Sequence, residues 1–109
     1  MISKSDNKKI KELTKAVLLL KNADEAKRFL RDLLTESELV EFGNRWKAAR
    51  MLSENKPYTE IIEQTGLSST TIARVSKWLN KGKGGYKKII GRIHRHTHHA
   101  SNLLQRGLS

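Results

Sequence analysis

The stretch from Pro57 to Leu79, PYTEIIEQTGLSSTTIARVSKWL, constrains the fold of this chain more than any other part of it. It is typical of two short helices joined by a tight turn at residues 65–68, where Gly66 is free to adopt the positive φ of a helix C-cap. This pattern predicts a helix-turn-helix, a motif whose second helix commonly lies in the major groove of DNA. The alternative is a helical hairpin packed inside an ordinary bundle.

The residues after the turn favour the DNA-binding interpretation. Ser68 can cap the second helix, and Ile72, Val75 and Leu79 recur at helical spacing, so we expect them to pack onto the preceding helix. Small hydroxyl and basic side chains remain on the outward face, where they can approach base edges and phosphates. The candidates for base contacts are Ser69, Thr70, Thr71 and Arg74, with Ser68 beside them. The candidates for phosphate contacts are Thr59, Lys77, Lys81 and Lys83.

The charge distribution supports a polyanionic partner. The chain carries a net charge of +11, from 22 Lys and Arg against 11 Asp and Glu. All of the acidic residues lie within residues 1–63, so the Lys and Arg of residues 64–109 have no acidic residue in that range to balance them. A field of one sign suits nucleic acid, although charge alone does not separate DNA from RNA or from an anionic membrane surface.

The rest of the chain predicts an all-α fold. We expect one amphipathic helix from about Lys4 to Lys21 and a second after Asn22. A capping box of Thr35 and Glu38 should begin a long helix that runs to about Glu54. After the glycine-rich NKGKGG segment, helical spacing returns up to residue 93. We therefore predict a helical domain over residues 1–93, with the helix-turn-helix at 57–79, and a basic, histidine-rich tail over residues 94–109.

Several other classes of protein fit the sequence poorly. The chain has no cysteine, and its apolar runs are too short for a signal peptide or a membrane span, so we expect a cytoplasmic protein. We find no enzyme signature and expect no cofactor. His94 and His98 lie four residues apart and could share a helix face as weak candidate metal ligands, but a solvated tail is the favoured interpretation, because no cysteine or carboxylate lies nearby.

The segments LLTESELVEFGNRWKAARML and WLNKGKGGYKKII, on either side of the helix-turn-helix, resemble the Trp repressor superfamily. The resemblance is greatest to its small bacterial Trp-repressor-like members, which share an ARML segment and a Leu-Asn-x-Gly-x-x-x-Tyr stretch. It covers roughly residues 10–93. It implies an intertwined helical homodimer that regulates transcription, as a repressor, by binding double-stranded DNA at a roughly palindromic site.

In the Trp repressor the corepressor tryptophan lies between two arginines, and the resemblance places Arg45 and Arg74 at those positions. The family's tryptophan sensor has glycine directly after the second arginine, whereas this chain has Val75. With Trp78 also nearby, we expect side chains to fill the ligand's space and DNA binding to be constitutive or differently controlled. Two alternatives remain open: a non-specific nucleic-acid binder, either RNA-binding or architectural, and a protein-interaction module.

Overall fold

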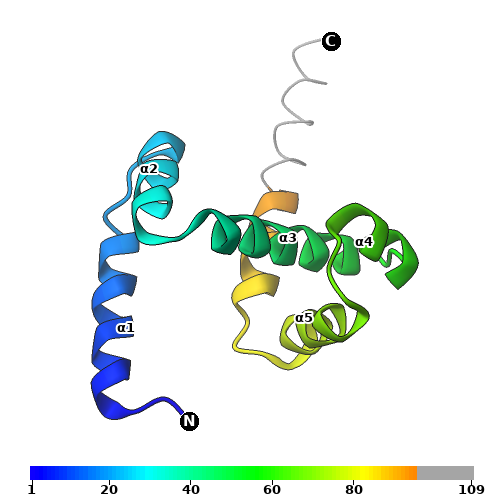
Figure 1. Cartoon of the computed structure of the whole chain (residues 1–109), viewed down its shortest axis with the longest axis horizontal. Coiled ribbons are helices and arrows are strands. Elements are labelled where there is room, and N and C mark those ends of the chain that lie inside the picture. The colour runs from blue at the N-terminus through cyan, green and yellow to red at the C-terminus, as the bar shows by residue number, and fades with distance from the viewer. Residues whose placement is uncertain (96–109) are drawn as a thin grey trace. The chain divides into compact units, whose positions relative to one another are not determined.

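The computed structural model describes residues 1–95, and every regular element in that range is a helix (Figure 1). The elements are α1 (Lys4–Val17), α2 (Ala23–Leu33), α3 (Glu36–Ser53), α4 (Tyr58–Thr65) and α5 (Ser69–Lys81). A bend at residues 82–84 leads into a further helical stretch, whose described part spans residues 85–95. The predicted all-α class is confirmed.

Local hydrogen bonds explain where the N-terminal helices begin. The Asn22 side chain accepts the backbone N–H of Glu25 at 2.9 Å, which caps α2. The hydroxyl of Thr35 accepts the backbone N–H of Glu38 at 3.2 Å, and the Glu38 carboxylate accepts the N–H of Thr35 at 3.0 Å. These reciprocal bonds are the predicted capping box. The pKa of the Glu38 carboxyl lies below its usual value, because hydrogen bonds to the carboxylate from the Thr35 backbone N–H and, second, from the Thr35 side chain favour the charged form.

The first helix is shorter than the sequence suggested. It ends at Val17, and the N–H groups of Leu19 and Leu20 then bond to carbonyls three residues back, at 3.0 and 3.1 Å. This tight turn ends the α-helix four residues before Lys21, the end expected from the leucine run.

The chain divides into two compact units, the first from Met1 to Val40 and the second from Glu41 onward. The first unit contains no buried side chain. It nevertheless carries large apolar residues that are exposed, on its helices and in the turn after α1: Ile10, Leu13, Val17, Leu18, Leu19, Leu30, Leu33 and Val40. The predicted inward faces of α1 and α2 are therefore present in the sequence but uncovered within this unit. The predicted boundary at residue 93 stays a prediction.

The second unit contains the core. Its eight buried apolar side chains come from α3, α4, α5 and the last helical stretch: Ala48, Ala49, Met51, Ile61, Ile72, Val75, Leu79 and Ile90. Full burial of an isoleucine or valine contributes about 1.5–3 kcal/mol, so this cluster is what holds α4 and α5 in place. Trp46 and Tyr86 flank it, with ring centroids 6.3 Å apart, and so attach residues 85–95 to α3.

Trp78 lies at the edge of this core rather than within it. Its side chain is 46% exposed. On α5 the buried positions are Ile72, Val75 and Leu79, and the helical period places Trp78 at the edge of that stripe rather than within it. The indole ring therefore borders solvent.

Candidate nucleic-acid interface

The turn between α4 and α5 is fixed by one glycine and one threonine. Gly66 caps α4 with φ 71°, and its N–H bonds to the carbonyl of Ile62 at 2.8 Å. The hydroxyl of buried Thr65 donates to the Ile61 carbonyl at 2.7 Å and accepts the N–H of Leu67 at 3.2 Å. The left-handed conformation and the bonded hydroxyl together reverse the chain within three residues, as the sequence predicted for Gly66.

The start of α5 is held by Ser68 and Thr71. The Ser68 hydroxyl accepts the backbone N–H of Thr71 at 3.1 Å and lies 3.0 Å from the Thr71 hydroxyl. Both side chains were candidates for DNA contacts. Both are engaged in the N-cap in this structure, so their first role is to fix the position at which the helix begins.

The two faces of α5 differ sharply in burial. Ile72 and Val75 are fully buried and Leu79 nearly so, which confirms the predicted stripe and its packing with Ile61. The opposite face is exposed and carries Ser69, Thr70, Ala73, Arg74 and Lys77. Because one side of the helix is locked into the core, the other side is presented in a fixed orientation.

The four candidates for phosphate contacts are all exposed. Thr59 lies in the first turn of α4, Lys77 and Lys81 lie in the C-terminal half of α5, and Lys83 lies in the bend that follows. The bend requires Gly82, because a Cβ there would lie 2.3 Å from the carbonyl oxygen of Trp78, which accepts the Gly82 N–H. The path of the chain that carries Lys83 thus depends on a glycine.

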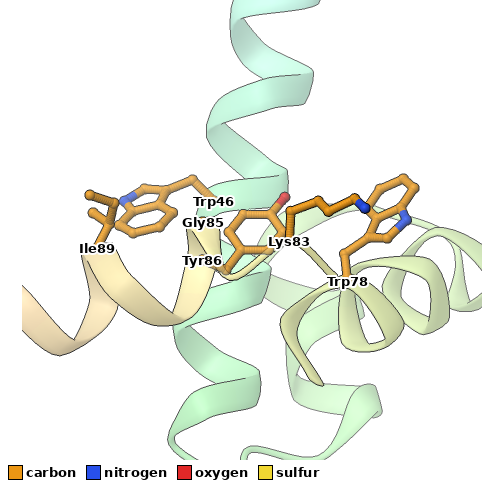
Figure 2. A pocket seen from close by; sticks show the side chains of 6 residues that line it. All are labelled: Trp46, Trp78, Lys83, Gly85, Tyr86 and Ile89. Atoms are coloured by element: carbon orange, nitrogen blue, oxygen red, sulfur yellow. The ribbon is translucent and has the colours of Figure 1, made fainter. Parts of the chain in front are cut away.

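Beside α5 lies an apolar hollow that sequence reasoning missed. It has a volume of about 540 Å³ and is lined by Trp46, Trp78, Lys83, Gly85, Tyr86 and Ile89. Figure 2 shows Tyr86 and Lys83 between the two tryptophan side chains in this view. The lining comes from three separate segments, so no local pattern marks it. The available signal was the position of Trp78 at the margin of the buried stripe.

Comparisons with known proteins agree on the family. The sequence model described as "Trp repressor protein" matches residues 8–94 of this chain. The chain is 37% identical over 92 residues to the uncharacterized protein YerC of Bacillus subtilis (strain 168), covering 84% of this chain and 88% of that protein. The chain belongs to the Trp repressor family. Its members are DNA-binding helix-turn-helix regulators, in keeping with the motif at α4 and α5.

Two solved structures share the fold of this Trp repressor family member. A TrpR-like protein from Eubacterium eligens ATCC 27750 is 38% identical, with a TM-score of 0.76 over 80% of this chain and 90% of that one. A candidate Trp repressor from Staphylococcus aureus is 33% identical, with a TM-score of 0.73 over 78% of this chain and 85% of that one.

The two arginines that the family resemblance singled out have different surroundings. Arg45 is partly buried on α3, where its guanidinium bonds to the Glu41 carboxylate at 3.1 Å and lies 5.4 Å from the centre of the Phe42 ring. Arg74 is exposed on α5. Val75, directly after Arg74, is fully buried in the core.

The remaining site candidates concern metals and membranes. His94 is exposed at the end of the described residues, and His98 lies outside them. Across residues 1–95, no group of three or more His, Cys, Asp or Glu side chains is placed to hold a metal ion. In the same range, no helix is both long and apolar enough to cross a membrane.

Proposed function

We propose that this Trp repressor family member is a homodimeric, sequence-specific repressor that places α5 in the major groove of double-stranded DNA. The observation that carries the proposal is the contrast between the two faces of α5. Ile72 and Val75 are fully buried, whereas Arg74 and its neighbours Ser69 and Thr70 are exposed. A helix anchored along one side can hold its outward side chains in register with base edges.

The exposed side chains of α5 suit a division of roles. Arg74 can donate two hydrogen bonds to O6 and N7 of guanine, which is the most common specific contact in the major groove. Ser69 and Thr70 are short enough to let the helix backbone approach the bases. Thr59, Lys77, Lys81 and Lys83 would bond to phosphates, which set position and affinity rather than sequence preference. Ser68 and Thr71 act mainly through the cap that fixes the helix start.

A second copy of the chain is the partner that the first unit requires. None of its side chains is buried, although the eight large apolar residues named above, on its helices and in the turn after α1, are exposed. Exposed apolar faces of this extent mark an interaction surface. A two-fold dimer would cover them and would bring two α5 helices to half-sites about 34 Å apart, hence a palindromic operator.

Control by free tryptophan is not part of the proposal. Full burial of Val75 supports the view that side chains occupy the space beside Arg74. Arg45 already has a carboxylate partner in Glu41 at 3.1 Å. DNA binding is therefore expected to be constitutive or to respond to a different effector. A regulator of this kind acts on DNA, so we expect it to be cytoplasmic.

Selection of bound duplexes from a random DNA pool, with and without tryptophan, tests the proposal. A palindromic consensus that does not depend on tryptophan is the expected result. Absence of enrichment in both conditions would refute sequence-specific binding and would favour a non-specific nucleic-acid binder. Sedimentation of the free protein tests the dimer separately.

The division of roles has its own test. On the selected operator, Arg74→Ala should lose about 1–3 kcal/mol of binding free energy and bind random DNA almost unchanged. Lys81→Ala should weaken binding to both duplexes alike. It should also reduce the slope of log K against log salt by the amount expected for about one phosphate contact. Equal losses on both duplexes for both variants would contradict the assignment of Arg74 to base reading.

A further inference from the structure

The helical stretch at residues 85–95 has two opposite faces. Tyr86 and Ile90 are one turn apart and pack against the core of the second unit, Tyr86 half-buried against Trp46 and Ile90 buried. Lys88, Arg92 and Arg95 follow at spacings of four and three residues, which places them together on the side of the helix opposite that anchor. All three are exposed. These three residues are called the basic strip below.

The charges of the basic strip are not neutralised locally. In the first part of the chain, some helical cations pair with acids: Arg28 bonds to Asp24 at 3.1 Å and Arg45 to Glu41 at 3.1 Å. From residue 64 to residue 95 the sequence contains no acid. Among the described residues, the ion pairs involve no residue beyond Arg45. A solvent-exposed helix face that serves solubility alone would ordinarily carry both acidic and basic side chains.

The dimensions of the basic strip suit a phosphate backbone. From residue 88 to residue 95 the helix rises by about 10 Å, which is about three steps of the 3.4 Å rise of a DNA strand. Gly91 lies beside the strip and adds no side chain between its cations. A Cβ at Gly91 would make only ordinary contact with the Arg95 guanidinium, at 3.6 Å, so local packing does not require glycine there.

We infer that Lys88, Arg92 and Arg95 form a second DNA-contacting surface, which binds backbone phosphates of duplex DNA without reading their sequence. The inference rests on the proposed DNA binding and adds to it a contribution separate from α5. The anchor at Tyr86 and Ile90 holds the strip on the folded unit, so its cations act from a fixed helix rather than from a loose tail. Operator affinity would then depend on two surfaces, of which only α5 distinguishes sequences.

The test replaces all three cations with glutamine, Lys88→Gln/Arg92→Gln/Arg95→Gln, in the full chain. Affinity for the selected operator and for a random duplex of equal length is measured by fluorescence anisotropy over a range of salt concentrations. Each lost phosphate contact should reduce the slope of log K against log salt by about 0.9, so three contacts should reduce it by nearly 3 per chain. At about 0.1 M salt the loss of affinity should exceed tenfold on both duplexes, with the ratio between them unchanged.

Two control variants isolate the position of the charge. Lys8→Gln/Lys15→Gln/Lys27→Gln removes the same three charges from exposed sites in the first unit and should leave the slope nearly unchanged. The charge-preserving Lys88→Arg/Arg92→Lys/Arg95→Lys variant should bind like the wild type. Circular dichroism confirms that each variant is folded.

The possible outcomes separate this inference from the proposed function. If the wild type binds the operator and the strip variant shows the same salt slope as the wild type, the inference is overturned but the proposed function is not. Equal effects of the strip variant and the first-unit variant would have the same consequence. A change in the operator-to-random ratio would show that the strip reads sequence, which also contradicts the inference. Failure of the wild type to bind any duplex would refute the proposed function itself.

Discussion

Replacing Gly66 with alanine tests the conformational argument for the turn between α4 and α5. Gly66 has φ 71°, and a Cβ built on it would meet no atom within 4 Å. The cost of the substitution is therefore not steric but that of a left-handed L-residue, about 1–2 kcal/mol. Gly66→Asn should cost less, because asparagine tolerates this region better than alanine. Urea unfolding followed by circular dichroism, at one fixed protein concentration, measures both variants.

The matched control is the same substitution at Gly43. This residue lies within α3, and a Cβ there also meets no atom within 4 Å, but its backbone is helical. Gly43→Ala should raise the free energy of unfolding by about 0.8–1 kcal/mol, since alanine is the better helix former. One chemical change thus has opposite signs at two open positions. A Gly66→Ala variant as stable as the wild type would refute the claim that the positive φ makes glycine necessary at the turn.

Two further predictions concern the core and the capping box. Ile72→Ala should lower the free energy of unfolding by about 2–5 kcal/mol, because the side chain is fully buried. Ile62→Ala should lower it much less, because Ile62 is 39% exposed, and equal losses in urea unfolding would contradict the described core. The lowered pKa of Glu38 means that its stabilising contribution is present above the ordinary glutamate pKa of about 4.3 and is lost as the pH falls through the lower folded-state value. Glu38→Gln keeps an acceptor for the Thr35 N–H but does not titrate. The thermal midpoint of this variant should therefore fall less than that of the wild type between pH 7 and pH 3. Parallel decreases would show that the Glu38 carboxylate is not a source of the pH dependence.

Much of the candidate interface could be predicted because it depends on short-range rules. The turn at Gly66, the cap at Ser68 and the buried stripe of Ile72, Val75 and Leu79 all follow from spacings of a few residues. The exposure of Arg74 follows from the same helical period. The engagement of the Thr71 hydroxyl with Ser68 was not predicted, since two neighbouring hydroxyls can face the solvent or each other.

The contacts between distant segments could not be predicted in this way. The apolar hollow requires Trp46, Trp78 and Tyr86 to meet, and these residues are separated by 32 and 8 positions in the sequence. Whether an aromatic ring at the margin of a stripe is buried depends on where the neighbouring helix passes, and helical periodicity contains no information on that path. For this reason, the exposure of the Trp78 ring could not be predicted from the sequence.

The sequence by itself determined where the described helices begin and that they are helices. Asn22, Thr35 with Glu38, and Ser68 each satisfy a backbone N–H three residues ahead, and such bonds form without distant partners. Only the tertiary structure decided which apolar faces are covered. Ile72 and Ile90 are buried because separate helices converge on them, whereas the equally apolar stripe of α1 is exposed. Burial is a property of an arrangement of helices, and a pattern within one helix specifies only which side is able to be buried.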